Sequence, residues 1–84
     1  MTQVTLDLPE TVFSTLHQAP DEFVREMRIV AAVKWYELGR VSQGRGAEIA
    51  GLTRADFIDA LSRHQVSPFQ YSPQDLAEEL RDAD

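Results

Sequence analysis

Polar and apolar side chains alternate over residues 3–8, with the apolar ones on one face: Val4, Leu6 and Leu8. This period of two predicts a short, half-buried strand. Pro9 ends the strand, because proline has no N–H to donate to a neighbouring strand. Over residues 10–16 the apolar positions recur at helical spacing, which predicts a short helix.

A longer helix is predicted over residues 21–38, with Asp21 as its N-cap and Gly39 just past its end. Its first half is amphipathic, whereas residues 29–36 are apolar nearly all round. A helix without a solvated face is buried on more than one side. In so short a chain a second subunit can supply the second side, which predicts a homodimer; the alternative is a helix at the centre of a monomer. The residues assigned to the dimer interface are Ile29, Val33, Trp35 and Tyr36.

Two more helices are predicted in the middle of the chain. Ser42 caps the first, which runs to Ala50, and Thr53 caps the second, which runs to about His64. The turn between them contains Gly51. Beyond this pair, a short acidic helix is predicted to begin at Ser72-Pro73, with two leucines on one face: Leu76 and Leu80. The expected fold class is therefore mainly α, with one short N-terminal strand and a short C-terminal helical tail.

The composition indicates one small globular domain. The chain has 84 residues, of which 43% are hydrophobic and 26% charged, and no cysteine. A chain of this length buries only about 60% of the surface that it exposes when unfolded. No apolar run approaches the ~20 residues of a membrane span, and the N-terminus lacks the basic and apolar regions of a signal peptide. A cytoplasmic protein without membrane contact is expected.

The charge is unevenly distributed along the chain. Residues 1–24 carry −4 and residues 67–84 carry −4, whereas residues 25–66 carry +2 and hold seven of the eight basic residues. The net charge of −6 argues against non-specific polyanion binding by the whole molecule. It is compatible with a DNA-binding face confined to residues 25–66.

Catalytic and metal-binding motifs find little support in the sequence. His17 and His64 lie far apart without metal-ligand spacing. The Gly44-Arg45-Gly46 stretch lacks the Gly-Lys-Ser/Thr ending of a phosphate-binding loop. We therefore expect no enzyme activity, no metal and no cofactor.

Residues 43–62 fit a helix-turn-helix, the DNA-binding motif in which a second helix enters the major groove. Ala47 and Gly51 provide the small residue and the turn glycine that the motif needs. The first residues of the second helix would then reach base edges. The alternative is a helical hairpin that serves packing alone, and two acidic residues, Asp56 and Asp59, would repel phosphate. The residues assigned to DNA are Arg40, Gln43, Arg45, Thr53, Arg54, Ser62 and Arg63.

The N-terminal strand is a second candidate for DNA contact. A strand followed by two helices in a dimer is the layout of ribbon-helix-helix regulators, whose paired strands enter the major groove. Gln3 and Thr5 would face the bases, although Asp7 faces phosphate unfavourably. The alternative, which we favour, is a strand that only dimerises or packs on the core.

Three stretches of the chain resemble a known family: residues 4–10, 36–42 and 47–57. The family consists of small uncharacterised prokaryotic proteins that are encoded beside PIN-domain ribonuclease toxins and regarded as their antitoxins. The resemblance covers roughly residues 4–80. It implies a helix-turn-helix fold, binding to the toxin and to operator DNA, and no catalytic residues. The family usually has alanine where this chain has Gly46, and a second glycine within one helical turn costs up to about 1 kcal/mol.

The tail beyond the helical pair is the expected toxin-binding segment. It can dock into a groove as a short helix with aromatic anchors, and a cation on it can enter the carboxylate cluster of a PIN domain. The alternative is an acidic tail that only keeps the protein soluble. The residues assigned to the toxin are Phe69, Tyr71, Leu76, Leu80 and Arg81.

Together these expectations divide the chain into three parts: residues 1–40 for dimerisation, residues 41–66 as the helix-turn-helix and residues 67–84 as the toxin-binding tail. The function expected is that of an antitoxin which neutralises a PIN-domain ribonuclease and represses its own operon. The alternative is a protein-interaction adaptor that never touches DNA.

Overall fold

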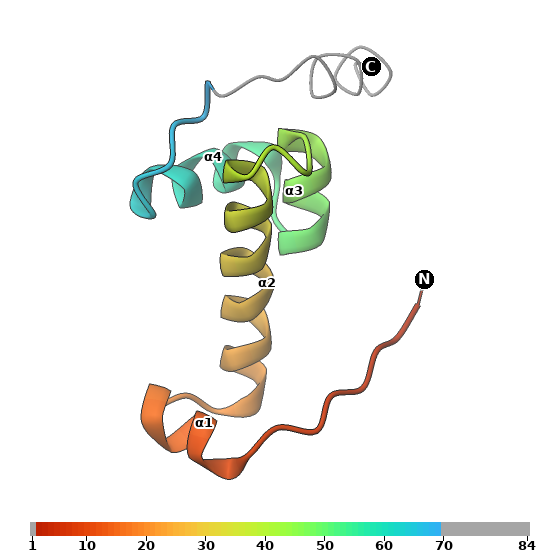
Figure 1. Cartoon of the computed structure of the whole chain (residues 1–84), viewed down its shortest axis with the longest axis vertical. Coiled ribbons are helices and arrows are strands. Elements are labelled where there is room, and N and C mark those ends of the chain that lie inside the picture. Colours follow the sequence, from red (N-terminus) through yellow and green to blue (C-terminus); the bar gives the residue numbers. More distant parts are fainter. Residues whose placement is uncertain (1, 70–84) are drawn as a thin grey trace.

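A computed structural model describes residues 2–69 and shows a mainly helical protein (Figure 1). Within this range lie the four helices α1 (Glu10–Leu16), α2 (Pro20–Glu37), α3 (Gln43–Ala50) and α4 (Arg54–Arg63). The long helix α2 forms the stem of the molecule. The pair α3 and α4 lies at its C-terminal end, and α1 lies at its N-terminal end. The mainly helical class predicted from the sequence is confirmed.

The hydrophobic core lies where α2, α3 and α4 meet. Several of its members are alanines, whose small side chains let the helices approach closely. The ring of Tyr36 meets that of Phe57 edge to face, with centroids 6.2 Å apart. The buried apolar residues are Ala32, Val33, Tyr36, Ala47, Ala50, Phe57, Ala60, Leu61 and Val66.

The predicted caps of α3 and α4 are confirmed. The Ser42 hydroxyl accepts a hydrogen bond from the Arg45 N–H at 3.1 Å, and the Thr53 hydroxyl accepts one from the Asp56 N–H at 3.1 Å. Gly51 ends α3 in the left-handed conformation, with φ of 72°. A residue with a Cβ atom is strained in this conformation, so glycine makes the short connection to α4 possible.

The start of α2 differs from the prediction. The helix begins at Pro20, with Ala19 as its N-cap, so Asp21 lies inside the first turn. The fixed φ of proline suits the first helical position, where its missing N–H leaves no hydrogen bond unmade. The Glu22 side chain accepts a hydrogen bond from the Ala19 N–H at 3.4 Å, whereas the N-cap itself makes no side-chain cap hydrogen bond of the kind predicted for Asp21.

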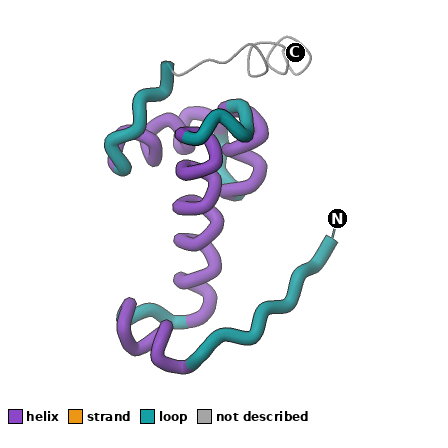
Figure 2. The backbone as a smooth tube through the Cα atoms, viewed as in Figure 1, coloured by secondary structure: helices purple, strands orange, loops and turns teal. Residues whose placement is uncertain are grey.

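The strand predicted over residues 3–8 is not shown by the structure. Residues 2–9 form an extended segment without regular secondary structure, which leads away from α1 (Figure 2). A strand needs a neighbouring strand to pair its backbone groups, and residues 2–69 of the single chain contain no other strand. Apolar and polar side chains alternate in the segment as predicted, but residues 2–69 provide no neighbouring strand with which its backbone could pair.

Candidate functional site

The buried side chain of Gln43 connects three parts of the protein. Gln43 is the first residue of α3 and is only 3% exposed. Its Oε1 accepts hydrogen bonds from Arg54 Nε at 3.1 Å and from Arg54 Nη2 at 2.9 Å. Its Nε2 donates to the Pro68 carbonyl and, at 3.4 Å, to the Tyr36 hydroxyl. One amide therefore ties the first turn of α4 to the end of α2 and to the segment that follows α4.

Tyr36 completes this connection from α2. Its hydroxyl donates to the Pro68 carbonyl at 2.9 Å, while its ring lies fully buried against Phe57. A buried hydroxyl without a partner would cost roughly 1–3 kcal/mol, so this contact is one that the core requires. The carbonyl of Pro68 thus accepts from two buried side chains, and they hold the chain at the point where the C-terminal tail begins.

The outer face of α4 is solvent-exposed and carries both acidic and basic side chains. Phe57, Ala60 and Leu61 face the core. On the opposite side Ser62 and Arg63 line a hollow of about 580 Å³ together with Leu52, Asp56 and Asp59. The two carboxylates lie beside the predicted phosphate contact Arg63. Arg54 begins α4, whose N-terminal N–H groups favour an anion, but the carboxylate of Asp56 lies in the same first turn.

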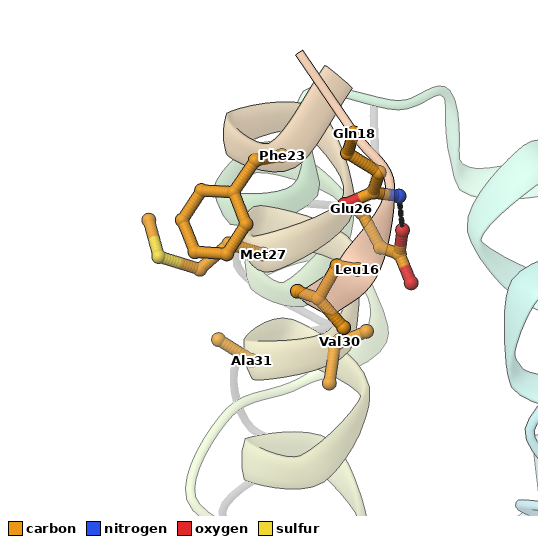
Figure 3. Close-up of a pocket in the computed structure, with 7 residues that line it drawn as sticks. All are labelled: Leu16, Gln18, Phe23, Glu26, Met27, Val30 and Ala31. Atoms are coloured by element: carbon orange, nitrogen blue, oxygen red, sulfur yellow. Dashed lines mark hydrogen bonds between the residues drawn. The ribbon is translucent and has the colours of Figure 1, made fainter. Parts of the chain in front are cut away.

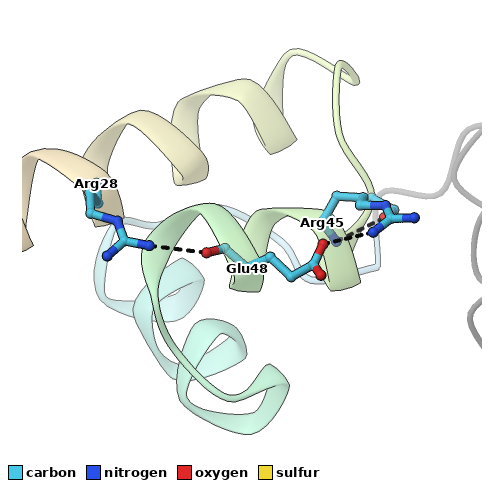
Figure 4. A network of polar contacts seen from close by, with 4 residues as sticks. Arg28, Arg45 and Glu48 are labelled. Atoms are coloured by element: carbon cyan, nitrogen blue, oxygen red, sulfur yellow. Dashed lines mark hydrogen bonds and ion pairs between the residues drawn. The ribbon is translucent and has the colours of Figure 1, made fainter. Parts of the chain in front are cut away.

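Arg45 and Glu48 form an exposed ion pair on α3, with Nη1 of Arg45 2.8 Å from Oε2 of Glu48 (Figure 4). Both side chains are more than half exposed. An exposed pair of this kind contributes little to stability, in the range of about 0–1 kcal/mol. The pair with Glu48 alone therefore adds little to stability, and the Arg45 guanidinium remains on the surface of α3.

Arg28 is a structural residue that the sequence did not reveal. From α2 its Nε donates to the Ile49 carbonyl at 2.8 Å and its Nη2 to the Glu48 carbonyl at 3.2 Å. These carbonyls belong to the last turn of α3, which has no basic residue of its own. The lack of a basic residue in this turn can be read from the sequence. The sequence does not show that Arg28, about twenty residues earlier in the chain, supplies the hydrogen bonds.

The residues predicted for the dimer interface divide into two groups. Val33 and Tyr36 are 5% and 0% exposed within the single chain, so neither offers an exposed side chain to a second subunit. Ile29 packs partly buried against the core. Trp35 is 38% exposed, on the solvent side of α2.

Of the remaining residues with a predicted role, the structure describes Arg40 and Phe69. Arg40 is exposed in the turn after α2, where its N–H donates to the Trp35 carbonyl at 2.8 Å. Phe69 is 81% exposed at the end of the described range. The remaining toxin-binding residues lie outside the described residues: Tyr71, Leu76, Leu80 and Arg81.

Within residues 2–69, no group of three or more histidine, aspartate or glutamate side chains is placed to hold a metal ion. In the same range, no helix combines the length and the apolar character needed to cross a membrane.

Comparison with known proteins gives one family. The model of an uncharacterised protein family, UPF0175, matches residues 1–84. Two proteins of Aeropyrum pernix, each named UPF0175 protein, are similar to the chain. One is 35% identical over 78 residues, which cover 93% of this chain and 82% of the relative. The other is 39% identical over 56 residues, which cover 67% and 71%. No solved structure matches the chain significantly.

Proposed function

The chain belongs to the uncharacterised protein family UPF0175, and from this premise we propose that it is a cytoplasmic DNA-binding antitoxin. In this proposal α3 and α4 act as a helix-turn-helix on operator DNA, and the C-terminal tail binds a PIN-domain ribonuclease. The protein itself catalyses no reaction and needs no cofactor.

The observation that carries the DNA-binding part is the pair of hydrogen bonds from Arg54 to Gln43. Arg54 is the first residue of α4, at the end of the helix that reaches base edges in a helix-turn-helix. Gln43 is buried and fixed by Tyr36 and Pro68, so it holds the guanidinium in one orientation. An arginine whose rotamer is already restricted loses less entropy when it binds the edge of a guanine.

The distribution of charge supports contact through this end of α4. Arg45 is exposed on α3, and Arg54 is at the start of α4, whose N-terminus favours anions. Asp56 lies in the same first turn of α4 and Asp59 about one turn farther on, and both line the outer face of the helix. We therefore assign base contact to Arg54 and phosphate contact to Arg45, and we expect the middle of α4 to lie farther from the DNA backbone.

Two observations support toxin binding by the tail. Phe69 is 81% exposed just after the Pro68 anchor, so an apolar side chain is offered to solvent where the tail begins. Residues 67–84 carry one basic residue against five acidic ones, which disfavours DNA as their partner. The PIN domain as partner comes from the family resemblance described above.

The proposal is tested by a mobility-shift titration of the full-length protein with the DNA upstream of its own gene and with random DNA. Arg54→Ala is expected to weaken operator binding by about 1–3 kcal/mol and to relax specificity at one base pair. Arg45→Ala is expected to weaken both DNAs alike and to lower the slope of log K against log salt by about one.

Lys34→Ala is the matched control, because it removes one exposed positive charge from α2 while leaving α3 and α4 intact. It should leave the affinity and the salt slope close to those of the unchanged protein. Absence of retardation for either DNA at about 50–100 mM salt, where phosphate contacts are strong, would contradict DNA binding and favour the adaptor alternative.

A further inference from the structure

An apolar band runs along the N-terminal half of α2 and onto α1. Phe23, Met27 and Val30 follow one another at helical spacing, and α3 and α4 lie at the other end of α2. Val30 is 42% exposed and Leu16, from α1, is 51% exposed. Figure 3 shows these side chains around a shared pocket of about 360 Å³. The apolar band is defined as Leu16, Phe23, Met27, Val30 and Ala31.

The N-terminal arm, residues 2–9, borders the same region. A second groove of about 760 Å³ is lined by Leu6 and Leu8 from the arm and by Phe23 and Met27 from α2. Val4 and Leu6 are 77% and 57% exposed. The apolar face of the arm and the apolar band are thus neighbouring parts of one surface.

The backbone of the arm lacks hydrogen-bond partners inside the described chain. None of the N–H groups of residues 2–8 donates to an acceptor within residues 2–69. An extended segment with alternating side chains and unpaired backbone groups is ready to pair with another strand. Residues 2–69 contain no strand that could pair with it, so its backbone groups are available to a strand of a second molecule.

We propose that this surface is the interface with a second copy of the chain, in which the two arms pair as an antiparallel two-stranded ribbon over the two apolar bands. With Leu6 opposite Leu6 of the second copy, Val4 lies opposite Leu8 and Thr5 lies opposite Asp7. Every apolar side chain of the arm then meets an apolar one, and Asp7 meets a hydroxyl instead of another carboxylate. The alternation is self-complementary about its centre, as a two-fold interface requires.

The size of the surface fits a stable dimer. A standard interface uses about 20–30 residues and about 800 Å² on each partner. The arm, the seven residues of α1 and the four further residues of the apolar band together hold 19 residues, close to the lower end of this range. A two-stranded ribbon alone is marginal in water, so packing on the apolar bands supplies the stability that pairing of the arms lacks.

This inference does not depend on the proposed function, because the surface is formed by the arm, α1 and the N-terminal half of α2 and uses no residue of α3 or α4. Sedimentation equilibrium of the full-length protein is expected to show a dimer at roughly 10 µM, which corresponds to a micromolar or tighter Kd. Leu6→Glu and Met27→Glu are each expected to raise the dimer Kd at least about tenfold, because each buries a carboxylate in the interface. Leu38→Glu is the control, since Leu38 is 58% exposed but lies at the far end of α2.

Disulfide cross-linking tests the register and does not depend on the folding of the glutamate variants. The chain has no cysteine, so Leu6→Cys introduces a single thiol. In the proposed ribbon this thiol lies opposite the same thiol of the second copy. Paired residues of an antiparallel ribbon have Cα atoms about 4.5–5.5 Å apart, within the range of a disulfide. Mild oxidation is expected to convert Leu6→Cys into a covalent dimer and to leave Leu38→Cys monomeric on a denaturing gel.

The proposal is overturned if the unchanged protein sediments as a monomer at roughly 100 µM, where a micromolar dimer would be fully formed. It is also overturned if a dimer forms that Trp35→Glu dissociates while Leu6→Glu and Met27→Glu do not. Equal cross-linking of Leu6→Cys and Leu38→Cys would likewise contradict it, because the thiols would then meet only by random collision.

Discussion

The ring of Phe57 packs directly on the backbone of Gly46, so closely that a Cβ atom at position 46 would lie 2.6 Å from Cζ and 2.7 Å from Cε2 of the ring. Phe57 is fully buried and its ring meets that of Tyr36 edge to face. Because the ring is fully buried, it can move away from position 46 only by displacing neighbouring core residues. The glycine that lowers the helix propensity of α3 is the residue that lets α4 pack against it.

We expect Gly46→Ala to destabilise the protein although alanine favours helices. The gain in helix propensity is about 1 kcal/mol, whereas overpacking a core costs typically about 1–3 kcal/mol. The free energy of unfolding, measured by urea denaturation, should therefore fall. The same change combined with Phe57→Leu is the control: once the ring is absent, adding the Gly46→Ala change should no longer destabilise. Stabilisation by Gly46→Ala in the unchanged background would contradict the contact.

Gln43→Leu is expected to lower the free energy of unfolding by about 1–3 kcal/mol, because it removes hydrogen bonds to Tyr36 and Pro68 and buries an apolar side chain beside polar groups. Tyr36→Phe removes one hydroxyl only and should cost less, about 1 kcal/mol. Operator affinity should fall for Gln43→Leu at protein concentrations where it is fully folded, since Arg54 loses its support. A fall in stability without any change in affinity would show that Gln43 serves the core alone.

Local signals in the sequence located much of the fold. Ser42 and Thr53 are helix caps whose chemistry is fixed by neighbours three residues away, and both were predicted correctly. Contacts between distant segments could not be predicted in this way. The sequence placed Gln43 on DNA, but its amide is buried between Arg54 and Pro68, which become neighbours only after folding. Nothing local distinguishes a buried glutamine at a helix start from an exposed one.

The central helix illustrates the same limit. Its apolar second half predicted burial on more than one side, but within the described residues only one face is buried: α3 and α4 cover Val33 and Tyr36, whereas Val30 and Trp35 are 42% and 38% exposed. The apolar residues in its first half, such as Met27, have no such cover among residues 2–69. Periodicity identifies an apolar face, whereas the element that covers it depends on the tertiary arrangement.

Arg28→Ala is expected to lower the free energy of unfolding by about 1 kcal/mol, the value of a typical net hydrogen bond, or somewhat more because the donor is charged. The loss has a specific cause: the carbonyls of Glu48 and Ile49 at the end of α3 lose their donor from α2. Arg25→Ala removes the same charge from the same helix and should change stability by less than about 0.5 kcal/mol. Urea denaturation of both variants under identical conditions makes the comparison; equal losses would show that charge, and not the carbonyl contact, is responsible.

The last prediction concerns the boundary between the folded body and the tail. The Pro68 carbonyl accepts from Tyr36 and Gln43, so residues up to 68 belong structurally to the core although their composition groups them with the tail. A chain that ends after Phe69 keeps this contact and loses a segment with one basic and five acidic residues, which changes the net charge from −6 to −2. We expect it to unfold at the same urea concentration as the full chain and to bind operator DNA equally or somewhat more tightly, because a repelling segment is gone. It should fail to retain the PIN-domain ribonuclease encoded beside its gene in a pull-down assay.

A chain that ends after Ser67 should lose the ribonuclease as well, but it should also be less stable by about 1–2 kcal/mol, because two buried donors lose their acceptor. If the chain ending after Phe69 still captures the ribonuclease while Arg54→Ala does not, the toxin is bound by the helical body, and the tail is only a solubilising segment.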